Sequence, residues 1–472
     1  MTTQRVSSVA IGFVVVIGIV ASLVAMSVDQ NQRHLTAPII VQAIVGIFAI
    51  HFAFSRRSTV PLTLALIIAF ELFRGCLVPL LIQVFGQDQP LYRQLGTYVD
   101  AASILWIGVA FFAAFTLTVM VRTILDGSTK YPPAEVGSMT HDVSTRGFAI
   151  LAIAGMVGLV LRFPTIDSIQ SFLVGNYDAL QTSVEGGLIG FVSAVLRPLL
   201  PLSIALAIVR RKRFHGRTPW ILWILLAGAT FFSLGSYGLN RAAFLLPIIA
   251  FVVASTRYFG VKVRASLAVL VGVGAMLAFF TIGIIRDGLY AARMGSSLWD
   301  GASRLQAMLQ TIILYGQSPL QSAPAVSEIG GATAWSLETL FNSVLSPIPG
   351  MPDFLRDRTG TALYNELLYQ NTLVRDQIIP SWFEVFASGG VLFLIFFGMA
   401  VAMVAFALDN AFWRSRSLVG VYSATLATLI CSQITISSIT ATLQNLIYFV
   451  MLPAGIAFFI SPRRASRGGR QV

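Results

Sequence analysis

The sequence predicts an all-α integral membrane protein, and three observations indicate this fold class. The 472 residues are 56% hydrophobic and only 11% charged, whereas a soluble domain carries about 25% charged residues. Apolar runs of about twenty residues, the length of a membrane-spanning helix, recur from one end of the chain to the other. The basic residues gather in alternate connections between these runs. We therefore expect residues 1–472 to form a single transmembrane domain.

The apolar runs predict about twelve transmembrane helices. Most runs approach the length that crosses the hydrocarbon core, and 147–162 and 242–256 are the shortest. The first run has no small-residue cleavage site before a polar stretch, so we interpret it as a retained span and not a signal peptide. The predicted spans are 8–27, 36–54, 60–84, 97–121, 147–162, 187–209, 218–235, 242–256, 265–285, 385–407, 417–434 and 439–460.

The distribution of basic residues predicts which side of the membrane each connection faces. With the N-terminus inside, the inner connections hold 20 of the 32 Lys and Arg residues, including the blocks VRRKRFHGR and SPRRASRGGR, and only four acidic residues. An excess of basic residues in the cytoplasmic loops is the positive-inside pattern. We therefore expect both termini in the cytoplasm and the protein in the inner, cytoplasmic membrane. The net charge of +12 follows from this topology, so we expect no nucleic-acid partner.

This orientation places one long connection, residues 286–384, on the outer face as a large periplasmic or extracellular loop. Long loops in compact folds are usually functional or disordered, and the composition here favours folded structure. The segment SLETLFNSVLSPIPGMP predicts a helix that begins after an N-cap at Ser336 and ends at Pro347. We expect two or three short helices of this loop to lie against the outer membrane surface.

Several ionisable residues fall inside the predicted spans, where they are functional candidates by default. Glu71 and Arg74 lie three residues apart on one helical face, and we interpret them first as a structural ion pair. Arg197 lies in mid-span directly before Pro198 and Pro201, which would open the backbone around it, and Arg241 lies at the outer end of a span. Arg162 and Arg286 also lie at outer ends, where they either snorkel to the headgroups or bind a ligand. Arginine holds phosphate in a bidentate fork, so these residues suit a lipid phosphate or diphosphate, or the substrate of an anion transporter.

The outer loop mixes carboxylates, arginines and aromatic rings, a combination that suits sugar binding. A solvated loop with aromatic residues at the headgroup level is the simpler interpretation, but it explains PGMPDFLRDRTGTALYNELLYQN poorly. The loop has no histidine or cysteine, so it offers no Ser–His nucleophile pair and no His or Cys metal site. A carboxylate is therefore the available general base, and arginine or a helix dipole would stabilise the leaving group.

Three features resemble the Wzy-type O-antigen polymerases, the oligosaccharide repeat unit polymerases of bacteria. They are a many-span body with one large outer loop before the last spans, an arginine that opens a late-middle span in GSYGLNRAAFLLPIIAF, and LSPIPGMP followed by IIPSWFEVFASGGVLFLIFFG. The resemblance covers roughly residues 235–410. It implies polymerisation of oligosaccharide repeat units linked to undecaprenyl diphosphate on the outer face, for surface polysaccharide or O-antigen biosynthesis. Membrane lipids, a chain-length regulator and a flippase would be its partners.

On this hypothesis the enzyme is a glycosyltransferase that needs no metal or other cofactor. The expected catalytic carboxylates are Glu338, Glu366 and Glu384, with Asp353 behind them. The expected diphosphate-binding residues are Arg197, Arg241, Arg286, Arg356 and Arg358, and the expected sugar-stacking rings are Trp335, Tyr364 and Tyr369. The alternatives are an O-antigen ligase, which resembles this architecture but carries a histidine in its outer loop, and a transporter of an anionic lipid or sugar.

Overall fold

A computed structural model gives the fold. It describes residues 11, 12, 14, 15, 18, 30–55, 61–85, 98–125, 145–169, 187–215, 219–234, 249–257, 335–369 and 379–460. Within these ranges, residues 255, 349, 350, 353 and 416 are not described. The described residues form helices and turns and contain no strand. The prediction of an all-α fold is confirmed for this part of the chain.

Seven described helices are long and apolar enough to cross a membrane, and two more are apolar but shorter. The long ones correspond to seven predicted spans: Arg33–Phe54, Leu62–Val84, Ala101–Leu125, Ile189–Lys212, Ser381–Arg414, Leu418–Thr435 and Ile439–Ile460. The shorter ones, Gly147–Arg162 and Trp220–Ser233, correspond to two further spans. The predicted spans 8–27, 242–256 and 265–285 lie largely or wholly outside the described residues. The chain is a helical membrane protein.

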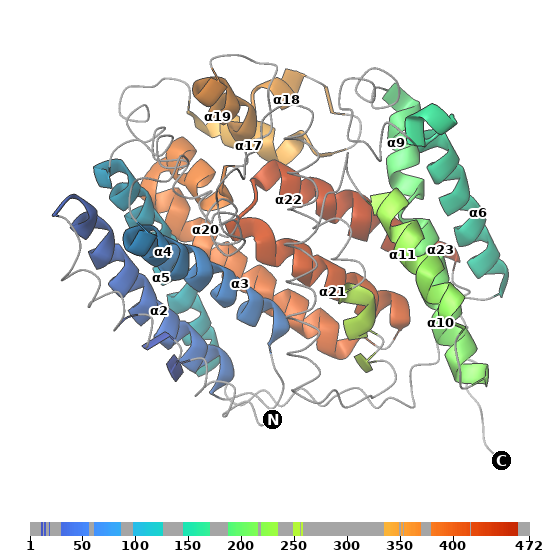
Figure 1. The fold of residues 1–472 in the computed structure, drawn as a ribbon, viewed down its shortest axis with the longest axis horizontal. Helices are drawn as coiled ribbons and strands as arrows, with labels where there is room; N and C mark the ends of the chain where they lie inside the picture. Colours follow the sequence, from blue (N-terminus) through green and yellow to red (C-terminus); the bar gives the residue numbers. More distant parts are fainter. Residues whose placement is uncertain are drawn as a thin grey trace. The chain divides into compact units, whose positions relative to one another are not determined.

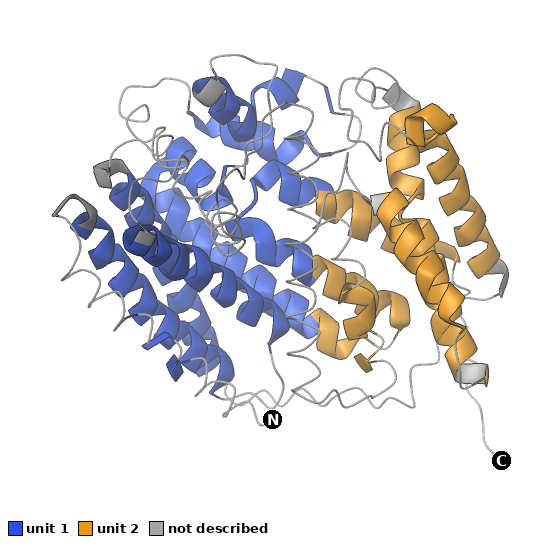
Figure 2. Cartoon of the chain, viewed as in Figure 1, with its two compact units in different colours: residues 1–132, 297–410, 428–444 blue, residues 133–296, 411–427, 445–472 orange. Residues whose placement is uncertain are grey.

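The chain forms two compact units, each assembled from segments that are distant in sequence (Figure 2). Unit 1 comprises Met1–Pro132, Ser297–Asn410 and Thr428–Gln444, and unit 2 comprises Pro133–Ser296, Ala411–Ala427 and Asn445–Val472. Unit 1 therefore joins the first described spans to the outer loop and to the helix that follows it.

The membrane helices of unit 1 pack around one apolar core. They are α2 (Thr36–Phe54), α3 (Leu62–Leu72), the π-helix η2 (Phe73–Leu77), α4 (Val78–Phe85), α5 (Tyr98–Leu125) and the long α20 (Ser381–Arg414) (Figure 1). Phe111, Phe112 and Phe115 of α5 are fully buried. At Gly398 of α20 an added Cβ would lie 2.8 Å from the Phe111 carbonyl oxygen, so this glycine allows α20 to approach the α5 backbone.

Helix α20 is bent at Gly390, whose φ of 72° is a left-handed conformation that favours glycine. Beyond the bend, the buried Asp409 accepts hydrogen bonds from the backbone N–H groups of Thr63, at 2.7 Å, and Leu64, at 3.5 Å. A carboxylate at these N–H groups satisfies donors that the first turn of α3 leaves unpaired. Asp409 therefore fixes the start of α3 against α20.

The described part of the long connection 286–384, the predicted outer loop, contains three short helices, α17 (Leu337–Leu345), α18 (Phe354–Asp357) and α19 (Gly360–Tyr369). They gather at one end of unit 1, where α20 begins (Figure 1). After α20 the chain forms α21 (Leu418–Ser432), the short 3-10 turn Gln433–Thr435 and α22 (Ile439–Leu446), and residues Thr428–Gln444 of this stretch belong to unit 1. The expectation of short helices in the loop is confirmed for its described part.

Unit 2 contains α6 (Thr145–Arg162), α9 (Gly187–Leu196), α10 (Leu199–His215), α11 (Trp220–Leu234), the π-helix Ile447–Met451 and α23 (Leu452–Ile460). An added Cβ at Gly155 or Gly158 of α6 would overlap backbone atoms of Leu200 or Arg197. The Ser193 hydroxyl donates to the Gly158 carbonyl oxygen at 2.9 Å. Small residues thus bring α6 into backbone contact with α9 and α10, as in many membrane helix pairs.

Candidate functional site

Residues 335–369, which we call the cap, form the described part of the outer loop. Helix α17 begins directly after Ser336 and its last residue is Leu345, so the predicted helix boundaries are confirmed. Ser336 has the extended backbone of an N-cap residue, but its side chain makes no capping hydrogen bond. Pro347, which lies in a turn, and Pro352 lie between α17 and α18.

Glu384 joins the cap to the membrane helices. The Ser343 hydroxyl of α17 donates to one carboxylate oxygen of Glu384, and the backbone N–H of Ile439 donates to the other at 3.3 Å. The backbone N–H of Gly360 in turn donates to the Ser343 hydroxyl at 2.9 Å. Glu384 itself is fully buried. One carboxylate thus connects α17, α19, the first turn of α20 and the first residue of α22.

Neighbouring contacts strengthen this connection. The Thr440 hydroxyl donates to the Ser343 carbonyl oxygen at 3.1 Å, and the Ser381 hydroxyl donates to the Ser437 carbonyl oxygen at 2.6 Å. An added Cβ at Gly360 would overlap the Glu384 carboxylate, so only glycine lets α19 begin here. The cap is therefore bonded to the membrane helices at several points and is not a loose surface loop.

The predicted catalytic carboxylates divide into exposed and buried groups. Glu338 and Glu366 are exposed on α17 and α19, and Glu338 forms an ion pair with Arg358 at 3.3 Å. Glu384 is buried and accepts hydrogen bonds from two segments, a geometry that suits positioning better than contact with a substrate. Asp353 lies outside the described residues. Among the described residues, no three His, Cys, Asp or Glu side chains lie close enough together to hold a metal ion.

The structure describes three of the predicted diphosphate-binding arginines. Arg356 and Arg358 are both exposed on the cap, beside the exposed carboxylates. Arg197 lies in unit 2, half-buried at the break between α9 and α10. Pro198 lies in the break and Pro201 in the first turn of α10, so the opened backbone that the two prolines predict is found here. Arg241 and Arg286 lie outside the described residues.

Arg162, at the end of α6, is 7% exposed, and its guanidinium donates to the carbonyl oxygen of Phe232 at 3.1 Å and lies over the ring of Phe163. These contacts within unit 2 account for the position of the Arg162 side chain, so snorkelling to the headgroups is not needed to explain that position.

Two of the predicted sugar-stacking rings are buried. Trp335 is 7% exposed and packs edge-on against Phe383, and Tyr364 is 1% exposed. Both rings belong to the apolar core of unit 1, whereas stacking on a sugar needs an open ring face. Tyr369 ends α19. Among the cap side chains whose exposure is described, the exposed rings are instead Phe341 and Phe354, and neither was predicted because phenylalanine is expected in the core.

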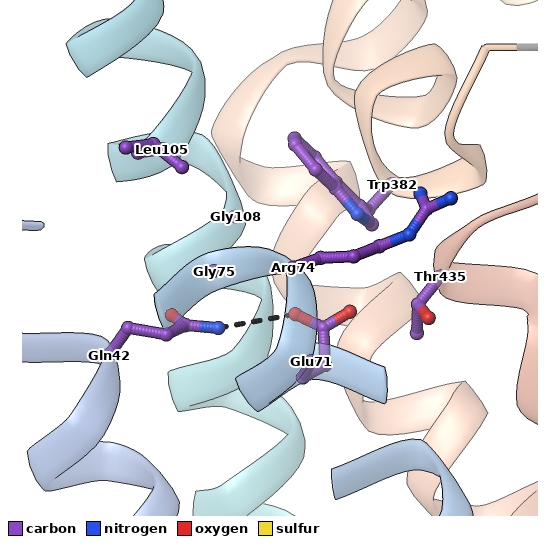
Figure 3. Close-up of a pocket in the computed structure, with 8 residues that line it drawn as sticks. All are labelled: Gln42, Glu71, Arg74, Gly75, Leu105, Gly108, Trp382 and Thr435. Carbon is purple, nitrogen blue, oxygen red and sulfur yellow. Dashed lines mark hydrogen bonds between the residues drawn. The ribbon is translucent and has the colours of Figure 1, made fainter. Parts of the chain in front are cut away.

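A second group of polar residues surrounds a small cavity among the membrane helices of unit 1 (Figure 3). Glu71 lies between the side chains of Gln42 and Thr435, and the Arg74 side chain extends past Trp382. Gln42 donates to the Glu71 carboxylate at 3.2 Å. Glu71 and Arg74 stand out in the sequence, but the other members do not, because most of them come from distant spans. The cavity is lined by Gln42, Glu71, Arg74, Gly75, Leu105, Gly108, Trp382 and Thr435.

In comparisons with known proteins, no family model, curated protein or solved structure matches the chain.

Proposed function

We propose that the protein polymerises oligosaccharide repeat units linked to undecaprenyl diphosphate, on the outer face of the cytoplasmic membrane. The observation that carries the proposal is the cap, a folded loop bonded through Glu384 to two membrane helices and bearing exposed arginines and carboxylates. The sequence features that resemble the Wzy-type polymerases include the same segments, from LSPIPGMP to the start of α20. A rigid polar surface at the end of a membrane bundle suits a substrate whose lipid stays in the bilayer.

In the proposed reaction a sugar hydroxyl of one lipid-linked repeat attacks the anomeric carbon of a growing glycan on a second lipid. The bond from that carbon to the diphosphate oxygen breaks, and the hydroxyl proton passes to a carboxylate. Glu366 is our first candidate for this general base because it is exposed on the cap. Glu338 is the second, because it is exposed but already paired with Arg358. Arg356 and Arg358 would stabilise the departing diphosphate.

The decisive experiment is the profile of lipid-linked glycans in cells that lack the protein. A polymerase predicts single repeats and no ladder of longer products. An intact long polymer that stays on its lipid carrier would indicate an O-antigen ligase and would overturn the proposal. In purified protein, Glu366→Gln should lower the rate by about 10²–10⁴-fold if Glu366 is the base, and excess EDTA should leave the rate unchanged.

A transporter of an anionic lipid or sugar is the second candidate, and the buried cluster around Glu71 favours it. Ionisable residues that face the interior of a membrane bundle frequently mark transport pathways. In cells without a transporter the single repeats would accumulate on the cytoplasmic side of the membrane. In cells without a polymerase they would reach the outer side, so the location of the single repeats separates the two functions.

A further inference from the structure

The cavity beside Glu71 lies inside the membrane-spanning helices and is lined by deeply buried polar groups. Glu71 is 4% exposed, Gln42 is 2% exposed and Thr435 is fully buried. Glu71 belongs to the candidate span Leu62–Val84 and Gln42 to the span Arg33–Phe54. Polar groups at such positions are costly unless they are hydrogen-bonded, so their partners decide what the cavity holds.

Two oxygen atoms of this group have no hydrogen-bond partner among the described residues. They are the side-chain carbonyl oxygen of Gln42 and the hydroxyl oxygen of Thr435. The cavity that both residues line has a volume of about 10 Å³, close to the lower limit for one water molecule. A buried water typically bonds to two to four otherwise unsatisfied polar groups. A single water molecule is therefore the occupant that fits both the volume and the unsatisfied oxygens.

Among the described residues, the charged and titratable groups that act on Glu71 come from its own span. Arg74 lies on the cavity, and Cys76 follows it in the same π-helix. The residues contributed by the other packed elements are uncharged: Gln42 from α2, Leu105 and Gly108 from α5, Trp382 from α20, and Thr435. Arg74 is therefore the cation among the described residues that line this cavity.

We propose that Glu71 and this cavity form a proton-binding site inside the membrane domain, with one water molecule linking the carboxylate to Gln42 and Thr435. The water carries a proton to Glu71, where an O–H bond forms on the carboxylate as one O–H bond of the hydronium breaks. Neutral water remains, and no electrons are transferred. This inference does not depend on the proposed glycosyl transfer.

The local helix geometry supports the assignment. The span changes from α-helix to the π-helix Phe73–Leu77 two residues after Glu71, and single π-helical turns are frequent at functional sites. An added Cβ at Gly75 of this turn would lie 2.8 Å from the amide nitrogen of Gln42. The glycine thus provides the space in which Gln42 reaches Glu71.

Infrared difference spectra of the purified protein in lipid nanodiscs, recorded as the pH is lowered, test the proposal. The wild type should gain a protonated-carboxyl band that Glu71→Gln lacks, and Thr435→Val should shift the frequency of that band because the hydrogen bonding around the carboxyl changes. Asp167→Asn, which removes an exposed carboxyl, should leave the band in place. Identical spectra for the wild type and Glu71→Gln would overturn the proposal.

A second pair of variants keeps the test decisive if Glu71→Gln does not fold. Thr435→Val and Gly75→Ala alter the cavity without removing the carboxylate, and each should shift the same band in a folded protein. If neither variant changes the spectrum, Glu71 keeps one charge state over the whole pH range and serves only as a partner of Arg74. The glycan profile described above would be unaffected by that result.

Discussion

Glu384 accepts hydrogen bonds from Ser343 and from the backbone of Ile439 while fully buried. Glu384→Ala removes both acceptors and leaves these donors unsatisfied, at a cost of about 1–3 kcal/mol for each buried group. We expect a lower unfolding temperature and faster amide hydrogen exchange in α17 and α19. Glu384→Gln should lose less, because its amide keeps one acceptor oxygen. Thermal unfolding and hydrogen-exchange mass spectrometry of the purified protein measure both effects.

Glu338→Gln is the matched control for this prediction. Glu338 lies on the same helix as Ser343, but its ion pair with Arg358 is exposed, with side-chain exposures of 66% and 67%. Exposed ion pairs contribute about 0–1 kcal/mol. If Glu384→Ala costs no more than this control, Glu384 does not hold the cap on the membrane helices.

The sequence was sufficient to identify Glu384 as unusual but not to show its role. A carboxylate at the mouth of a span suggests chemistry, whereas its partners Ser343, Gly360 and Ile439 are between 24 and 55 positions away along the chain. The burial of Trp335 and Tyr364 was hidden for the same reason, since their packing depends on residues far away in the sequence. The roles of these site residues therefore depend on contacts between segments that are distant in the sequence, which local patterns do not reveal.

At the scale of elements, the bend at Gly390 sets the direction of the first turns of α20, which carry Trp382 and Glu384. An added Cβ at Gly390 would meet nothing within 4 Å, so Gly390→Ala tests the backbone alone. The left-handed φ should make this substitution destabilising by about 1–3 kcal/mol. Gly228→Ala is the control, because its Cβ also meets nothing and alanine favours a helix by about 1 kcal/mol. Equal thermal unfolding of the two variants would contradict a left-handed backbone conformation at residue 390.

The contact between α6 and the helices α9 and α10 gives a second prediction at this scale. A side chain at Gly155 would overlap backbone atoms of Leu200, and backbone cannot move aside as a flexible side chain can. Gly155→Val should therefore destabilise unit 2 by about 1–3 kcal/mol or more, seen as faster hydrogen exchange in α6 and α10. Gly228→Val serves as the comparison in open space. Equal exchange in the two variants would show that the close approach is not needed.

Local patterns predicted most elements but not their internal irregularities. Apolar runs located nine described spans, and Ser336 and Pro347 located α17, because these signals act within a few residues. Pro198 and Pro201, which follow Arg197, also predicted the break between α9 and α10. The π-helix Phe73–Leu77 and the bend at Gly390 were not predicted, since both depend on how neighbouring helices fit together. Gly75, for example, is explained only by its contact with Gln42.

For the whole molecule, the remaining prediction concerns sidedness, on which the proposed lipid-linked donor depends. The basic blocks near Arg213 and Arg464 should keep their ends of the spans in the cytoplasm, because Lys and Arg are retained there. Reporter fusions after Arg213 and after Arg464 should therefore give cytoplasmic signals, and a fusion near Gly330 should give an outer signal. In the proposed reaction, the cap meets substrates that arrive on a lipid only if it lies on the outer face. A cytoplasmic signal at Gly330 would place the cap beside nucleotide-sugar donors, and the proposed polymerisation of lipid-linked repeats would then have to be abandoned.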